Sequence, residues 1–175
     1  LVAGTAAVFL QLVLGAAMRH QHAGLAIPDF PSAYGQWWPA TDSESLLRYN
    51  QRRTHESEVT AFQIHLQMVH RLGAVLCFSL IWGAAIQTVR RLGRGALLSR
   101  GVMVWAGLVL MQFSLGMLTI WTNKAADVAT LHVAGGALLL LNGTVLILVA
   151  RKLTVAARSA APVTPVGVIA PTAVS

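Results

Sequence analysis

Two histidines in apolar surroundings are the residues of this sequence that could most readily do chemistry. His70 lies in FQIHLQMVHRLGAVLCF (residues 62–78), His132 lies in TLHVAGG (residues 130–136), and a glycine follows each histidine three residues later. Arg71 comes directly after His70. Polar side chains at membrane depth cost about 2.5–3.5 kcal/mol on insertion scales, so they usually face a bundle interior and have a function.

The elements that must position these residues are long apolar helices. Hydrophobic residues make up 55% of the chain and charged residues 11%, against about 25% charged in soluble domains. A membrane-spanning helix needs about 20 apolar residues. Four runs are long enough: 1–18, 62–86, 101–121 and 128–150. No run alternates apolar and polar residues as barrel strands do. We therefore predict an all-α fold, an integral membrane four-helix bundle.

The charge distribution predicts the orientation of the bundle. The segment QTVRRLGRGALLSR between the second and third runs has four arginines and no acidic residue, and all six acidic residues fall in 19–61 and 122–127. Basic loops stay in the cytoplasm. Both termini are therefore predicted to be cytoplasmic, with loops 19–61 and 122–127 on the external side. This bias accounts for the net charge of +7, so we expect no nucleic-acid partner.

The ends of the chain differ in composition. The run 1–18 has no initiating Met and no basic segment before it, so we expect a span within a larger protein rather than a signal peptide. The four-helix unit is predicted to cover 1–153. Residues 154–175, rich in Ala, Pro and Val, are predicted to form a disordered cytoplasmic tail.

A short internal repeat relates the two halves of the bundle. QLVLGAAM (11–18) and QFSLGMLT (112–119) share Gln, two residues, Leu and Gly. Each is followed by an external loop and then by a span with a histidine near its outer end. A five-residue match in apolar sequence can arise by chance, but histidine is rare in spans. The repeat therefore predicts two related helical hairpins.

Both histidines are predicted to lie at similar depth in the outer half of the membrane. Two neutral imidazoles on facing helices are the ligand set of a six-coordinate haem iron, whose flat ring packs between the helices. On this interpretation Gly73, Gly135 and Gly136 leave room for the ring. The side chains expected to line it are Leu66, Val69, Leu131 and Leu138.

Arg71 has a role in the same hypothesis, because a guanidinium can pair bidentately with a haem propionate. Arg19 and His20, which follow the first span, are further candidates beside the propionates. The alternative, which stays open here, is that His70 and Arg71 reach toward the interface or hydrogen-bond inside the bundle without a cofactor.

The other histidines are weaker candidates. His65 precedes His70 by five residues, about 140° around a helix, so the two cannot bind one iron together. We expect it to be interfacial. His22 and His55 lie in the external loop, where solvated surface is the simpler interpretation and metal ligation the alternative. The same loop is rich in proline and aromatic residues, as a lid or a headgroup anchor would be.

Four motifs in order make the chain resemble the haem A synthase family: MRHQHAGLAIPDFP, QMVHR, QFSLGMLT and TLHVAGG. The resemblance covers residues 1 to about 150. It implies an oxidoreductase that converts a methyl group of haem O to the formyl group of haem A for cytochrome oxidase assembly. Members of that family have two homologous four-helix halves, each with a pair of histidines.

The resemblance is to the C-terminal, haem b half. The substrate half typically has a glutamate three residues before the histidine of the His-Arg pair, and here that residue is Gln67. The resemblance implies His70 and His132 as iron ligands, with Gln67 and Arg71 around the haem. Ile27 stands where the family's loop often has cysteine, so no loop disulfide is expected. A bis-histidine iron has no open position, so this half alone is expected to transfer electrons without making haem A.

The implied partners are the lipid bilayer, an N-terminal homologous half that binds haem O, haem O synthase and an electron donor. The implied location is a bacterial inner (plasma) membrane. Two other functions stay open: a non-catalytic membrane cytochrome b, which would need a redox partner but no porphyrin substrate, and a cofactor-free membrane assembly protein, which would show no haem spectrum.

Overall fold

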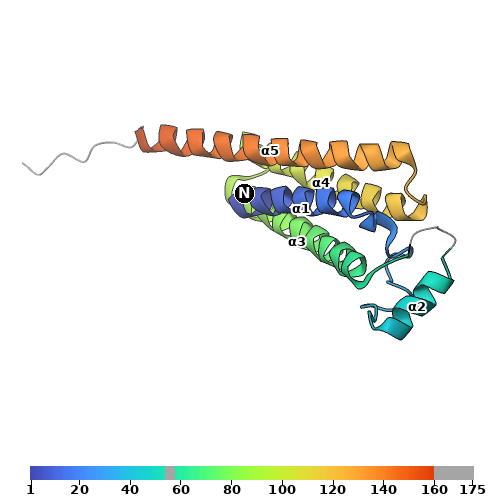
Figure 1. Ribbon diagram of the computed structural model, residues 1–175. Coiled ribbons are helices and arrows are strands. Elements are labelled where there is room, and N and C mark those ends of the chain that lie inside the picture. The colour runs from blue at the N-terminus through green and yellow to red at the C-terminus, as the bar shows by residue number, and fades with distance from the viewer. Residues whose placement is uncertain (54–57, 160–175) are drawn as a thin grey trace, which may run out of the picture.

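Four long helices dominate the computed structural model, which describes residues 1–53 and 58–159 (Figure 1). They are α1 (Val2–His20), α3 (Ala61–Leu92), α4 (Leu97–Trp121) and α5 (Ala126–Ser159). Each is long and apolar enough to cross a membrane, and the described residues form no β-strand. The predicted all-α membrane fold with four spans is confirmed.

The helices pack in a closed ring. Helices α1 and α4 each pack against both α3 and α5. The N-terminus and the C-terminal end of α5 lie toward one end of the bundle, here called the terminal end, and α2 (Ser43–Gln51) lies at the other, the loop end (Figure 1). The chain therefore forms two hairpins, α1–α3 and α4–α5, side by side.

Two helices extend past their predicted ends. Helix α3 continues to Leu92 and stops at Gly93, whose φ of 76° favours glycine. Helix α5 continues to Ser159, so 154–159 are helical and not the start of a disordered tail. The reason is local: this stretch is rich in alanine and has neither glycine nor proline to end the helix. The rest of the predicted tail lies outside the described residues.

A core centred on Trp105 joins the helices toward the terminal end. The indole is fully buried, and its Nε1 donates a hydrogen bond to the Leu139 carbonyl at 3.0 Å. A Cβ added to Gly4 or Gly143 would stand 2.9 or 2.8 Å from the ring. Only glycine on α1 and α5 leaves room for this side chain. The other buried members are Val8, Cys77, Ile81, Ala85, Val102, Ala106, Val109, Leu139 and Leu146.

A second, smaller core ties the 21–60 loop to the start of α3. Its buried members are Ala26, Ile27, Ala33, Tyr49, Val59, Ile64 and Met68. The rings of Tyr34 and Tyr49 stack with centroids 3.7 Å apart. On α3, His70 lies between Met68 of this core and Cys77 of the Trp105 core. The level of the bundle that contains His70 and His132, here called the histidine layer, therefore separates the two cores.

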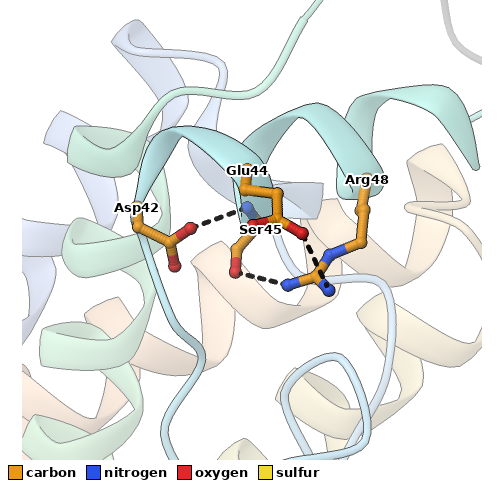
Figure 2. Close-up of polar contacts among 4 residues, drawn as sticks. All are labelled: Asp42, Glu44, Ser45 and Arg48. Carbon is orange, nitrogen blue, oxygen red and sulfur yellow. Dashed lines mark hydrogen bonds and ion pairs between the residues drawn. The ribbon is translucent and has the colours of Figure 1, made fainter.

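Helix α2 in the loop was not predicted. Its N-cap is Asp42, whose carboxylate accepts a hydrogen bond from the Ser45 amide at 3.0 Å (Figure 2). Hydrogen bonds from Ser45 lower the pKa of Asp42. Arg48 donates to the Ser45 hydroxyl at 2.9 Å and lies 3.7 Å from Glu44. A capping aspartate before a short polar segment is a helix-start signal that the sequence carried.

Candidate functional site

His70 and His132 occupy matched positions in the two hairpins. A Cβ on Gly15 of α1 would stand 3.4 Å from Cε1 of His70, and a Cβ on Gly116 of α4 would stand 3.2 Å from Cε1 of His132. Both Nδ1 atoms are buried, and among the described residues neither has a hydrogen-bond partner.

The glutamines of the repeat contact the same two histidines. Gln11 Nε2 donates to the His70 carbonyl at 2.7 Å, and Gln112 Nε2 donates to the His132 carbonyl at 2.8 Å. In each hairpin the glutamine and the glycine four residues later thus pack on one histidine of the neighbouring helix. The short sequence repeat corresponds to a repeated three-dimensional arrangement.

The glycines after the histidines have a different role from the one expected. Gly73 and Gly135 lie against the side-chain oxygens of Gln11 and Gln112. A Cβ on Gly136 would stand 2.7 Å from Leu12. Close contacts between helices account for these glycines in the structure.

Three of the four expected lining residues point outward. Val69, Leu131 and Leu138 are 46%, 58% and 51% exposed, and only Leu66 is half-buried. The helix period alone did not identify which face turns inward, because these spans are apolar on all sides.

Gln67 is buried and holds the loop against α3. Its Oε1 accepts a hydrogen bond from the Ile27 amide at 2.6 Å. Its Nε2 donates to the carbonyls of Ile27 at 3.2 Å and Gly24 at 3.4 Å. The side-chain amide therefore pairs with the Ile27 backbone as a neighbouring strand would, and it satisfies polar groups that are buried with it.

Arg71 holds the next stretch of the same loop. Its guanidinium donates to the Asp29 carbonyl at 2.6 Å and the Ser32 carbonyl at 2.9 Å, and lies 5.5 Å from the centre of the Phe30 ring. Its Nε is buried and has no partner in the described part of the chain. The Nε N–H of this residue is therefore among the donors that could bind an anion such as a propionate.

The Asp29 side chain organises the turn that Arg71 binds. Its carboxylate accepts hydrogen bonds from the Ser32 hydroxyl at 2.6 Å, the Tyr34 amide at 2.7 Å and the Gly35 amide at 2.9 Å. Burial acts to raise the pKa of Asp29, but these hydrogen bonds outweigh it, and the pKa lies below its ordinary value of 3.8.

Phe30 extends the loop across to the second hairpin. Its ring meets Phe113 and Trp121 of α4 edge-on, with centroids 6.2 and 6.4 Å apart. Since Arg71 of α3 lies on the same ring, one loop residue contacts both hairpins at the loop end. The loop thus covers the histidine layer from that side.

The remaining candidates lie apart from this arrangement. Arg19 and His20 are exposed in the last turn of α1. His22 is exposed, and so is His65, whose ring lies 6.5 Å from that of Trp38. His55 lies outside the described residues.

The donor chemistry of the histidine layer fits a haem. Two imidazoles from facing hairpins, whose Nδ1 atoms have no hydrogen-bond partner among the described residues, are the ligands that a bis-histidine iron needs. If the histidines only joined helices, their ring nitrogens would be expected to have partners, because buried polar atoms rarely go unpaired.

Comparison with known proteins points the same way. Residues 1–144 match a family described as cytochrome oxidase assembly protein. The chain is 30% identical to a heme A synthase of Bacillus cereus (strain AH187) and 32% identical to one of Bacillus anthracis (strain A0248). Each match extends over 124 residues, 71% of this chain but only 34% of the relative. No solved structure matches.

Proposed function

The chain belongs to the haem A synthase family of cytochrome oxidase assembly proteins, and we propose that it forms the haem b-binding half of such an enzyme. The family is one of oxidoreductases, and four apolar helices mark the chain as an integral membrane protein. The chain spans only 34% of the length of this relative. We therefore propose, as part of the same hypothesis, that the whole enzyme oxidises the haem O methyl group to the haem A formyl group.

The two histidines carry this proposal. His70 and His132 would bind the iron, and a haem b held there would supply reversible one-electron transfer. The observation in favour is that each imidazole sits against a glycine with its Nδ1 buried and without a partner among the described residues. The cofactor-free alternative needs hydrogen bonds from these rings.

Gln67 and Arg71 contribute by holding the loop over the site. Their five hydrogen bonds to loop backbone keep Gly24–Ser32 against α3, which limits access of water to the histidine layer. Arg71 keeps Nε for a propionate. Arg19 and His20, exposed at the end of α1, remain candidates for the same groups.

The orientation of the bundle in the membrane and the partners of the chain follow from the same hypothesis. Charges at the terminal end are all basic between Ala61 and Trp121, which supports cytoplasmic termini and external loops at 19–61 and 122–127 in a bacterial inner membrane. The other four-helix half would bind haem O, and haem O synthase and an electron donor would act with it. This half alone is expected to make no haem A.

The test is the dithionite-reduced minus oxidised spectrum of the purified chain from haem-supplied cells. We expect a low-spin b-type spectrum that is lost in both His70→Ala and His132→Ala. His65→Ala is the matched control, because this exposed histidine lies on the same helix and its loss should leave the spectrum unchanged.

A folded wild-type chain without haem would overturn the ligand assignment. A second experiment distinguishes an enzyme from an electron carrier: the chain is co-expressed with the other half, and the haems are extracted and identified. The enzyme reading predicts haem A, and a cytochrome b predicts none.

A further inference from the structure

Each histidine is held by a glutamine from the neighbouring helix in a unit that the structure contains twice. We call this unit a clasp: Gln11, Gly73 and the His70 carbonyl in the first hairpin, and Gln112, Gly135 and the His132 carbonyl in the second. The glutamine nitrogen donates to the carbonyl of the histidine itself. The glutamine oxygen lies against the glycine that follows the histidine by three residues.

The clasp holds the backbone of the histidine and not its ring. A helical carbonyl has a second lone pair after it accepts its helix hydrogen bond, and the glutamine uses it. Within residues 1–53 and 58–159, the Nδ1 atoms of both rings have no hydrogen-bond partner. A contact at the histidine carbonyl restricts both the rotation of α3 or α5 about its axis and its shift along that axis, and these two movements decide where the imidazole lies.

The glutamine oxygens show that helix stability alone does not explain the clasp. Oε1 of Gln11 and Oε1 of Gln112 are both buried without a hydrogen-bond partner among the described residues. Each faces a glycine backbone, where a weak Cα–H···O contact is the best it can form. A buried unpaired amide oxygen is unfavourable, and an apolar side chain of the same size would avoid it. The same unfavourable arrangement nevertheless occurs at both histidines.

We propose that Gln11 and Gln112 are positioning residues, which set the depth and rotation of the imidazoles of His70 and His132. This inference rests on the proposed haem-binding function for its purpose, since the positions that matter are those of two ligands on one ring. The glutamines touch neither iron nor ring. They act through the backbone of the histidine, and Gly73 and Gly135 are glycines because the glutamine side chain occupies the place of a Cβ.

The first test is a clash and its relief, read by thermal unfolding of the purified chain. Gly73→Ala should lower the unfolding temperature, and a second change, Gln11→Ala, should restore most of the loss. Gly135→Ala and Gln112→Ala should behave in the same way. Gly83→Ala on α3 and Gly107→Ala on α4 are matched controls, because a Cβ there meets no atom within 4 Å. If Gly73→Ala behaves like Gly83→Ala, the end of the Gln11 side chain yields to a Cβ without cost, and it is not held firmly enough to position His70.

The second test asks whether the clasp positions the ligand. Gln11→Met and Gln112→Met keep the side-chain volume and remove the amide. We expect unfolding temperatures at or above that of the wild type, because the unpaired oxygen is gone, together with shifted low-spin ferric EPR g-values and a shifted midpoint potential. Wild-type g-values and potential in both variants would overturn the positioning role. A wild-type chain without haem would refute the proposed function, and the unfolding comparison would still decide whether the glutamines are held firmly.

Discussion

The two hairpins share the histidine clasp and differ in the segment that covers it. In the first hairpin, Gln67 and Arg71 flank His70 and bind the 21–60 loop. At the equivalent positions around His132 stand Ala129 and Val133, and only residues 122–125 join α4 to α5. Both hairpins contain the glutamine clasp that supports the histidine. Only the first hairpin has a long loop, the 21–60 loop, that covers the histidine layer.

A second difference lies deeper in the bundle. Trp105 stands seven residues before Gln112, and its equivalent seven residues before Gln11 is Gly4. The indole of one hairpin fills the space left by the glycine of the other. A strictly symmetric pair of hairpins would place either two indoles or none there. The two hairpins are thus complementary around Trp105 and alike at the histidines.

The largest effect is expected where the hairpins are complementary. Trp105→Ala removes a fully buried indole and its hydrogen bond to Leu139, and we expect a loss of about 3–5 kcal/mol in the free energy of unfolding. Reversible unfolding in mixed micelles measures it. The control is Trp37→Ala, because Trp37 is 89% exposed. Equal stabilities of the two variants would contradict the described core.

The next effect concerns the cover. Arg71→Ala removes two hydrogen bonds from a charged donor to loop carbonyls, each worth about 1.5–3 kcal/mol. The loop should open while the helices stay folded. Faster trypsin cleavage after Arg48 and Arg52 would report it, and Val133→Ala, the equivalent change in the second hairpin, should leave the rate unchanged. Protection that survives in Arg71→Ala would show that another contact holds the loop.

A smaller effect is expected at Gln67. Gln67→Ala leaves the buried Ile27 amide without its partner, at about 1–3 kcal/mol. Hydrogen exchange of the Ile27 amide should become faster in proportion to this loss of free energy. Exchange at the start of α5 should not change, because the residue equivalent to Gln67 there is already an alanine, Ala129. Unchanged exchange at Ile27 would mean that the amide finds a different acceptor.

The smallest effect depends on pH and is confined to the cover. The pKa of Asp29 is lowered in the folded chain because hydrogen bonds to its carboxylate outweigh the effect of burial. Its contribution to the turn is therefore fully present above about pH 3.8 and is lost as the pH falls through the lower folded value. The Tyr34 and Gly35 amide NMR signals should report this loss, and Asp29→Asn should abolish the pH dependence.

The sequence predicted the parts of this structure that depend on local composition. Four apolar runs specified four helices, and the Gln-x-x-Leu-Gly repeat indicated the two hairpins. The extra turn of α5 beyond 153 and helix α2 were missed, although an alanine-rich stretch and the Asp42 cap both signal helix. In both places the helix signal is confined to a few residues within a longer segment of different composition.

The contacts across the chain could not be predicted in the same way. Gln67 and Arg71 were expected beside a cofactor, and their described partners are backbone groups of the loop about 40 residues earlier in the sequence. Gly73 and Gly135 were expected to face a ring, and they face glutamines of a neighbouring helix. Gln11 and Gln112 were visible in the repeat, but their partner is a backbone carbonyl, which carries no sequence signal.

The central claim is that each hairpin supplies one imidazole to one shared cofactor. It is tested most directly by chemical rescue of His70→Gly and His132→Gly with free imidazole, followed by the reduced minus oxidised spectrum. We predict that both variants lose the low-spin spectrum and that both regain it when imidazole fills the vacated position. A low-spin spectrum that persists in either variant without imidazole would contradict the claim.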